Sequence, residues 1–254
     1  MGYRRFGKVI EKVLIVARLV RARRINRDYS DSSKRVFDSG CGRGEFLKQL
    51  AKYGWEAHGS EVRGVISPSE MDPKVTLHIV DVTNPNPLAN FQNESLSLIS
   101  SFHNLEHLDD PIGFLHFAQY ALKKHGFLII EVPNIASFQA NLAKESWIHL
   151  DTDNHNFHFS NETLRNALAL SKFTIQSFRT FSIQYGVFGL IDSFCAKILR
   201  IESPFDLFQR ESFLGKLFAA LMCLILFLPC LLAEALLSQF GKGGVCRVVA
   251  KKST

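Results

Sequence analysis

The 254-residue sequence predicts an α/β fold, in which a mostly parallel sheet carries helices on both faces. Three observations lead to this prediction. Short apolar runs alternate with longer helical patterns over residues 36–185, as in a βαβ chain. A glycine-rich turn follows the first run, and an acidic residue lies at or next to the end of each of the first three runs. The composition is 46% hydrophobic, which suits a folded globular chain better than a disordered one.

Each expected strand is an apolar run bounded by polar or turn-forming residues. The strands are expected over residues 35–39, 56–61, 75–80, 96–100, 126–132, 173–181 and 245–250. Helical patterns lie between them, and the expected helices cover residues 45–54, 111–123 and 160–170. Gly54 suits the end of the first helix, and Pro111 suits the start of the second.

Charge is distributed unevenly along the chain. Eleven Lys/Arg and three Asp/Glu fall within the first 35 residues, so the formal net charge of +6 arises from this segment. Apolar side chains recur there at helical spacing, at Phe6, Val9, Ile10, Val13, Ala17 and Val20. Such a basic amphipathic helix can meet acidic phospholipid, nucleic acid or an anionic substrate, or it can present a solvated face.

The chain divides into three parts. Residues 1–34 form the basic helical segment, residues 35–185 with 241–254 form the α/β domain, and residues 186–240 form an apolar helical insertion. No secretory leader is expected, because charged residues interrupt the first apolar stretch and no cleavage site follows it. The cysteines contain no CxxC pair and suggest buried thiols in a reducing cytoplasm. They are Cys41, Cys195, Cys223, Cys230 and Cys246.

The best-defined motif is the turn Asp38-Ser39-Gly40-Cys41-Gly42-Arg43-Gly44 after the first expected strand. Its glycines allow a sharp turn and a close approach of the backbone to a ligand. In a dinucleotide-binding G-x-G-x-x-G pattern the third glycine would fall at Glu45, whose carboxylate would oppose a pyrophosphate. Asp38 favours a ligand with a positive end instead.

This turn resembles motif I of the class I S-adenosylmethionine-dependent methyltransferases, hydrophobic-hydrophobic-Asp-x-Gly-x-Gly-x-Gly. The resemblance implies S-adenosylmethionine as cofactor and a Rossmann-like sheet of seven strands in the order 3-2-1-4-5-7-6, with the last strand antiparallel. It implies that the cofactor is held by Asp38, Gly40, Cys41, Gly42 and Gly44.

Further matches to this family follow in order over about 100 residues. Glu61 follows the first glycine by 21 residues, where an acidic side chain accepts the ribose hydroxyls. Asp81 and Val82 resemble the positions that contact adenine. The segment from Phe102 and His103 through Leu105-Glu106-His107 to Pro111 resembles the region after the fourth strand, and we expect Phe102 and His103 to contact the cofactor.

The segment from Trp147 to Ser160 resembles a branch called the methyltransferase-23 or ubiquinone-methylase-like group. It departs from that branch at Asp153-Asn154, where Pro-Arg is common. We expect His155 and His158 to be catalytic, with His155 as general base if the acceptor is a hydroxyl. His107, Asn134 and Trp147 are expected in the substrate pocket. No metal is expected, because methyl transfer from a sulfonium needs none.

An apolar block of seventeen uncharged residues, 217–233, precedes the last expected strand. It is short for a membrane span and is interrupted by Pro229. A single crossing would separate the last two strands of one sheet. The block is therefore expected as a helical hairpin, which either dips into one leaflet of a membrane or caps the domain as a buried surface or dimer interface.

We therefore predict a methyltransferase acting on a small-molecule or lipid-linked acceptor, with oxygen as the expected methyl acceptor. The protein is expected in the cytoplasm, in peripheral or monotopic contact with the inner, anionic face of a membrane. Two alternatives remain: a non-catalytic S-adenosylmethionine-binding protein and an RNA methyltransferase. Nucleic acid is not expected as a partner, because the sequence lacks an Asn-Pro-Pro-Tyr-type element and interleaved aromatic and basic residues.

Overall fold

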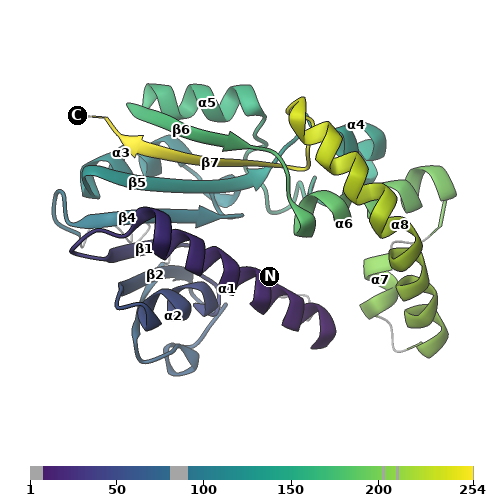
Figure 1. Ribbon diagram of the computed structural model, residues 1–254, viewed down its shortest axis with the longest axis horizontal. Helices are drawn as coiled ribbons and strands as arrows, with labels where there is room; N and C mark the ends of the chain where they lie inside the picture. The colour runs from purple at the N-terminus through teal and green to yellow at the C-terminus, as the bar shows by residue number, and fades with distance from the viewer. Residues whose placement is uncertain (1–7, 81–90, 202–203, 210–211, 254) are drawn as a thin grey trace.

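The computed structural model describes residues 8–80, 91–201, 204–209 and 212–253. A seven-stranded sheet with the order β3-β2-β1-β4-β5-β7-β6 forms its centre (Figure 1). The five strands β1 to β5 run parallel, and β7 pairs antiparallel with both β5 and β6. This confirms the predicted fold class and strand order. The strands are β1 (Arg35–Ser39), β2 (Glu56–Val62), β3 (Val75–Val80), β4 (Leu96–Phe102), β5 (Leu122–Pro133), β6 (Phe173–Arg179) and β7 (Val245–Lys252).

The helices begin where the sequence supplies caps. Asp110 Oδ1 accepts a hydrogen bond of 2.7 Å from Gly113 N at the start of α3, and Ser160 and Thr163 form a capping box at α5. The helix that begins at Pro111 ends at Ala121, two residues before its predicted end at 123. It ends there because β5 already begins at Leu122, opposite Leu96. The helices are α1 (Lys8–Tyr29), α2 (Glu45–Lys52), α3 (Pro111–Ala121), α4 (Phe138–Ala143), α5 (Asn161–Leu170), α6 (Phe188–Phe194), α7 (Pro204–Gln209) and α8 (Phe213–Gln239).

Two hydrophobic cores lie on opposite faces of the sheet, because successive strand residues point to opposite sides. In β1, Val36 packs into the core under α1 and α2, whereas Phe37 packs into the core under α3 and α5. In β5, Leu128 packs into the same core as Phe37, and Ile129 packs into the same core as Val36. Burial on both faces explains why these strands are nearly continuous apolar runs.

The basic N-terminal helix packs onto the domain through its second half. Ala22 and Ile25 are buried against α2, and Trp55 Nε1 donates a hydrogen bond of 3.0 Å to Asn26 Oδ1. Val20, which belongs to the apolar stripe described from the sequence, is 52% exposed. The residues that dock the helix lie beyond that stripe.

The insertion before β7 is helical, as expected. The expected hairpin is wrong for the apolar block 217–233, because the whole block lies in one continuous 27-residue helix, α8, which runs through Pro229. Helix α7 packs beside it at the edge of the molecule (Figure 1). By length and composition α8 could cross a membrane: its most apolar window has a mean hydropathy of 2.5 and is only 11% buried.

The end of α8 is tied to the sheet by one buried carboxylate. Glu234 Oε1 accepts hydrogen bonds from Gly244 N (3.0 Å) and Ser182 N (3.3 Å). Burial raises the pKa of Glu234 to about 7, although the two backbone donors oppose the rise. The helix is therefore fixed at its C-terminal end and exposed along most of its length.

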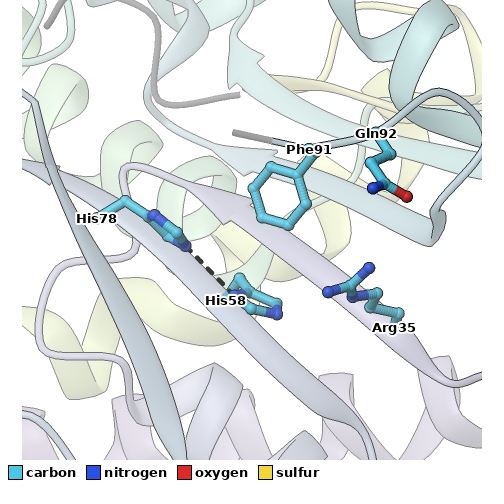
Figure 2. A pocket seen from close by; sticks show the side chains of 5 residues that line it. All are labelled: Arg35, His58, His78, Phe91 and Gln92. Atoms are coloured by element: carbon cyan, nitrogen blue, oxygen red, sulfur yellow. Dashed lines mark hydrogen bonds between the residues drawn. The ribbon is translucent and has the colours of Figure 1, made fainter. Parts of the chain in front are cut away.

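A cavity of about 280 Å³ lies towards the amino ends of the first strands and is lined by Arg35, His58, His78, Phe91 and Gln92 (Figure 2). His58 Nδ1 lies 3.2 Å from His78 Nε2, and Glu56 Oε1 lies 2.8 Å from His58 Nε2. Arg35 opens β1, whereas the glycine turn follows the end of that strand, so the cavity is separate from the turn.

Candidate active site

The glycine turn sits where β1 ends between β2 and β4, the point at which strand order reverses and ligands bind in open α/β sheets. Gly40, Gly42 and Gly44 have φ values of 71°, 54° and 68°, which side chains rarely adopt. A Cβ on Gly40 would lie 2.4 Å from Asn104 Cγ. The backbone of the turn is held by two hydrogen bonds to Ser60 O, from Gly40 N (3.0 Å) and Cys41 N (2.9 Å).

Asp38 is buried directly under this turn. Its Oδ1 accepts a hydrogen bond of 2.6 Å from Ser100 Oγ, and the register aligns Asp38 with Ser100 across β1 and β4. Burial raises the pKa of Asp38 to about 7, which outweighs the lowering by Ser100 and by the nearby Arg21. A cationic ligand group at this carboxyl would favour its ionised form.

Glu61 faces the same turn from the neighbouring strand. Its Oε2 accepts a hydrogen bond of 2.8 Å from Gly42 N, and its Oε1 accepts one of 2.9 Å from Val62 N. The structure thus brings together Asp38, the glycines and Glu61, as predicted for one cofactor site. The predicted adenine contacts Asp81 and Val82 lie outside the described residues.

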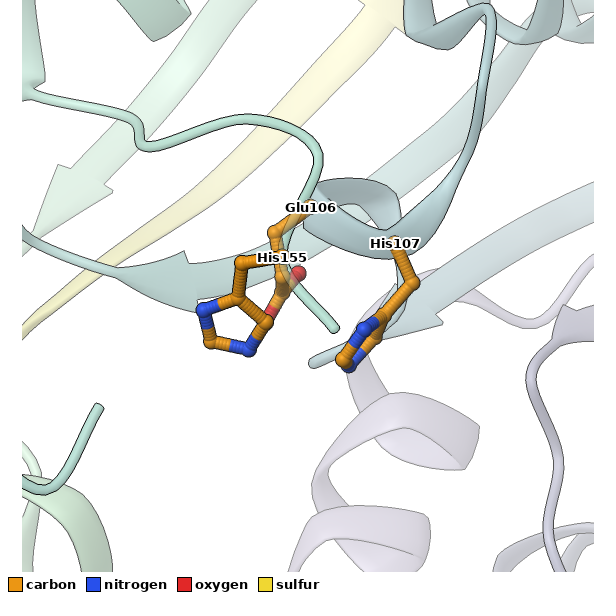
Figure 3. Close-up of side chains that lie close together, drawn as sticks. All are labelled: Glu106, His107 and His155. Carbon is orange, nitrogen blue, oxygen red and sulfur yellow. The ribbon is translucent and has the colours of Figure 1, made fainter. Parts of the chain in front are cut away.

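The expected histidine region lies beside this turn, at the end of β4. Glu106, His107 and His155 each direct a ligand atom towards the others, and these atoms lie within 4.8 Å of one another (Figure 3). Glu106 is buried and His155 is half-buried. Burial lowers the pKa of His155, so the neutral imidazole is favoured there.

His158 and Asn134 take positions that organise the surrounding loops. His158 Nε2 lies 2.6 Å from Leu150 O, so this nitrogen donates to a backbone carbonyl. Asn134 is fully buried, and its Nδ2 donates to Gly243 O at 2.9 Å and to Gly241 O at 3.2 Å. Asn134 therefore joins the end of β5 to the turn before β7.

Trp147 and His149 offer buried nitrogen atoms near these groups. Trp147 Nε1 and His149 Nε2 have no hydrogen-bond partner among the described residues. Burial, with His103 nearby, lowers the pKa of His149 to about 3, so its imidazole is neutral. A bound molecule could use both nitrogens.

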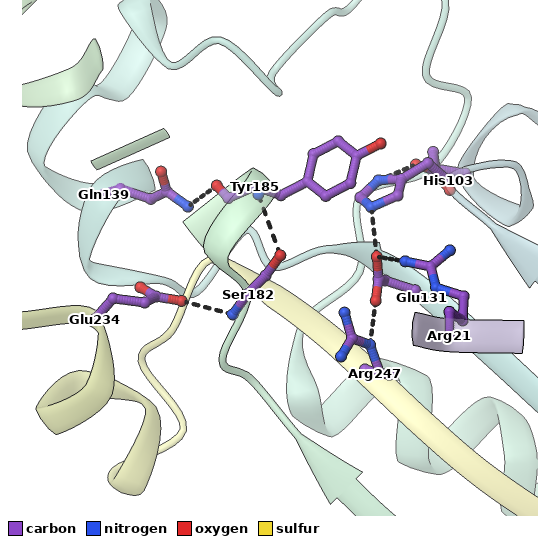
Figure 4. A network of polar contacts seen from close by, with 9 residues as sticks. Arg21, His103, Glu131, Gln139, Ser182, Tyr185, Glu234 and Arg247 are labelled. Carbon is purple, nitrogen blue, oxygen red and sulfur yellow. Dashed lines mark hydrogen bonds and ion pairs between the residues drawn. The ribbon is translucent and has the colours of Figure 1, made fainter. Parts of the chain in front are cut away.

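A buried ionic network centred on Glu131 was not predicted from the sequence (Figure 4). Glu131 lies on β5 and is contacted by His103 Nε2 at 3.1 Å, by Arg21 Nη2 at 3.4 Å and by Arg247 Nε. Burial alone would raise the pKa of Glu131, but these cations hold it far below its usual range. The signal in the sequence was an acidic residue inside an otherwise apolar strand.

The network connects the N-terminal helix to the predicted cofactor contacts. Arg21 Cζ lies 3.9 Å above the centre of the Phe102 ring, and the centres of the His103 and Tyr185 rings are 3.6 Å apart. Burial would lower the pKa of His103, but the carboxylates of Glu106 and Glu131 raise it. Sequence reasoning missed Arg21 and Tyr185 because neither belongs to a local motif.

Residues 10–177 match the family described as "Methyltransferase domain". A curated relative, a ubiquinone biosynthesis O-methyltransferase from Hydrogenovibrio crunogenus, is 26% identical over 116 residues, which are 43% of this chain and 47% of that protein. The chain thus spans about half the length of this relative.

Solved structures share the fold. A S-adenosylmethionine-dependent methyltransferase from Archaeoglobus fulgidus has a TM-score of 0.57 and 21% identity, covering 92% of this chain and 94% of that one. Phosphoethanolamine N-methyltransferase 2 from Haemonchus contortus has a TM-score of 0.59 and 16% identity, covering 92% and 53%. The chain belongs to the methyltransferase-domain family, the class I methyltransferases whose methyl donor is S-adenosylmethionine.

Proposed function

We propose that the chain transfers a methyl group from S-adenosylmethionine to an oxygen atom of a small-molecule or lipid-linked acceptor. The observation that carries this proposal is the convergence at one switch point of Asp38, the three-glycine turn and Glu61. The choice of oxygen is supported by the curated relative, whose name is that of an O-methyltransferase.

The chemistry requires little from the protein beyond orientation, because the sulfonium already activates its methyl group. Asp38 and Glu61 are suited to bind the donor, the first near its cationic amino-acid end and the second at the ribose hydroxyls. An acceptor hydroxyl must also lose its proton. We place that step at the cluster of Glu106, His107 and His155, which lies beside the end of β4.

Calorimetric titration of the full chain with S-adenosylmethionine tests the donor site. We expect binding of one molecule, and loss of binding in Gly40→Ala, because the added Cβ would collide with Asn104. Gly54→Ala is the matched control: its φ is also positive, at 81°, but nothing lies within 4 Å of the added atom. Absence of binding by the unmodified chain would refute the proposed function.

The acceptor is tested with labelled methyl donor and fractionated extracts. We expect label in a small-molecule or lipid fraction, as a methyl ether. Donor binding without any labelled product would instead support a non-catalytic binding protein. Label confined to RNA would support the alternative nucleic-acid substrate.

We further propose that α8 lies on a membrane surface beside the active site. Its exposed side chains include Leu224 (76%) and Leu228 (60%), and their neighbours along the helix are similarly apolar. Helices α1 and α8 both extend past the carboxyl ends of the strands (Figure 1), so the two helices flank the same end of the sheet. A single crossing by α8 is incompatible with the pairing of β6 and β7.

Flotation with vesicles containing anionic lipid tests this contact. The full chain should float, and Leu224→Lys with Leu228→Lys should abolish flotation without impairing donor binding, because charge at these positions cannot enter the acyl region. Leu170→Lys is a matched control, since Leu170 is 73% exposed on α5, away from α8. Equal flotation of all three proteins would exclude α8 from membrane contact.

A further inference from the structure

Glu106, His107 and His155 form a group of metal-ligating side chains beside the methyl-transfer site. Glu106 and His107 lie on the short turn that follows β4, and His155 lies on the loop before α5. Each residue offers one ligand atom, and these three atoms lie within 4.8 Å of one another. Figure 3 shows the three side chains close together. Residues distant in sequence therefore converge on one point.

Glu106 gives independent evidence that a ligand belongs there. The residue is 1% exposed, and neither carboxylate oxygen has a hydrogen-bond partner among the described residues. The nearest cationic nitrogen is His103 Nδ1, 3.7 Å from Glu106 Oε1, and the other nitrogen of that ring is bonded to Glu131. Buried carboxylates are normally hydrogen-bonded, paired or bound to a metal; among the described residues Glu106 has only the ion pair with His103, which it shares with Glu131, and no hydrogen bond.

His107 is oriented as a ligand. Its Nδ1 lies 2.8 Å from Asn154 O, and because a carbonyl can only accept, this nitrogen carries the proton. Nε2 of the neutral ring is then unprotonated and available to a cation. A metal-binding histidine commonly donates its other N–H to a backbone carbonyl in this way, which fixes both tautomer and ring orientation.

We propose that Glu106, His107 and His155 bind one divalent cation and that the cation takes the acceptor hydroxyl as a further ligand. Two imidazoles and one carboxylate suit Zn²⁺ and similar cations, whereas Mg²⁺ prefers oxygen ligands alone. Three protein ligands also leave an open position for an acceptor. Ligand bonds of about 2.0–2.2 Å would draw the three side chains slightly closer together.

The cation would ease the loss of the hydroxyl proton, and this part of the inference rests on the proposed function. A metal-bound oxygen releases its proton to solvent water far more readily than a free hydroxyl. That oxygen then forms a bond to the methyl carbon while the bond from carbon to sulfur breaks. The products are the methyl ether, S-adenosylhomocysteine and one proton, and no oxidation is involved.

Zinc binding to the full chain tests the site directly. Protein treated with EDTA and dialysed is titrated with Zn²⁺ by calorimetry, and bound metal is counted by mass spectrometry. We expect one tightly bound ion, and at least tenfold weaker binding in Glu106→Gln and His155→Ala. His116→Ala, at an exposed position on α3, and His78→Ala, in the separate His58–His78 pair, should bind as the unmodified chain does.

The outcomes separate a failed metal site from a failed methyltransferase. No bound zinc, equal binding by all variants, or loss only in His78→Ala would overturn the site, whatever the donor titration shows. Each variant must retain donor binding and its thermal unfolding temperature, and Glu106→Gln keeps the side-chain size if His155→Ala does not fold. With an acceptor in hand, methylation that is insensitive to EDTA would overturn the activating role of the cation.

Discussion

Burial gives Asp38 a pKa of about 7, so its charge changes within the physiological range. Only the carboxylate attracts the cationic end of the donor. Affinity for S-adenosylmethionine should therefore fall by about tenfold between pH 8 and pH 6, as the ionised fraction falls by a similar factor. Calorimetry across this range provides the measurement. Asp38→Asn should bind weakly and almost independently of pH; the same pH profile in this variant would show that another group is responsible.

Replacement of Glu131 should lower the free energy of unfolding substantially. Glu131→Gln keeps the volume but leaves Arg21 and Arg247, which are 24% and 32% exposed, without their shared carboxylate. Loss of a buried ionic partner typically costs about 3–5 kcal/mol, and the partial exposure of both arginines favours the lower end. Urea denaturation provides the measurement. Glu94→Gln removes an exposed carboxylate paired with Lys252 and should cost much less.

At the scale of elements, α8 is attached to the rest of the fold through the Glu234 carboxyl group, whose pKa is raised by burial. The folded pKa values of Glu234 and Asp38, each about 7, are raised above their unfolded values. Raised values mean that the folded state binds more protons, so stability should decline as pH rises from about 5 through 7. Urea denaturation of the donor-free chain at pH 5.5 and pH 8 measures this decline.

Glu234→Gln should make that decline shallower, because the amide still accepts from Ser182 N and Gly244 N but does not ionise. Glu234→Ala should be destabilising at both pH values, since two buried backbone donors lose their partner. Glu162→Gln, at an exposed position, is the control. An unchanged pH dependence in Glu234→Gln would exclude Glu234 as a source of the effect.

Most strands were predictable because each is a short apolar run with a clear boundary. The start of β5 was missed: Lys123 and Lys124 extend the helical pattern, yet Leu122 pairs with Leu96 in the sheet. The docking face of α1 was also missed. Ala22 and Ile25 are buried by contact with α2, and that contact is tertiary, so the periodicity of the helix alone does not reveal it.

At the scale of the whole molecule, the uneven charge predicts how membrane binding responds to salt. The excess of Lys/Arg lies in the first 35 residues, and each such side chain near anionic lipid contributes about 1 kcal/mol. Flotation with anionic vesicles should weaken as NaCl rises from 0.1 to about 0.5 M, because the Debye length shortens. Flotation with neutral vesicles should be weaker and insensitive to salt. Identical salt responses for both vesicle types would exclude a role for the basic segment.

The donor site was predictable where its residues follow one another along the chain. Asp38, the glycines and Glu61 belong to a strand–turn–helix–strand unit with fixed spacing. Arg21, Glu131 and Tyr185 were missed because they come from three distant elements and meet only when the sheet closes. The sequence also indicated His155 and His158, but the inward position of Glu106 emerged from the fold alone.

The order β5-β7-β6 has a consequence for biosynthesis. β6 pairs with β7 and not with β5, so it has no neighbour in the sheet until the chain has been made past Val245. α8 is made before that point, and its apolar length therefore leaves the ribosome while the sheet is still incomplete. Long-range pairing of this kind is slow to form. During that interval an unpaired strand and an apolar helix are exposed together, so this half of the molecule has the greatest need of a chaperone or of an early membrane contact.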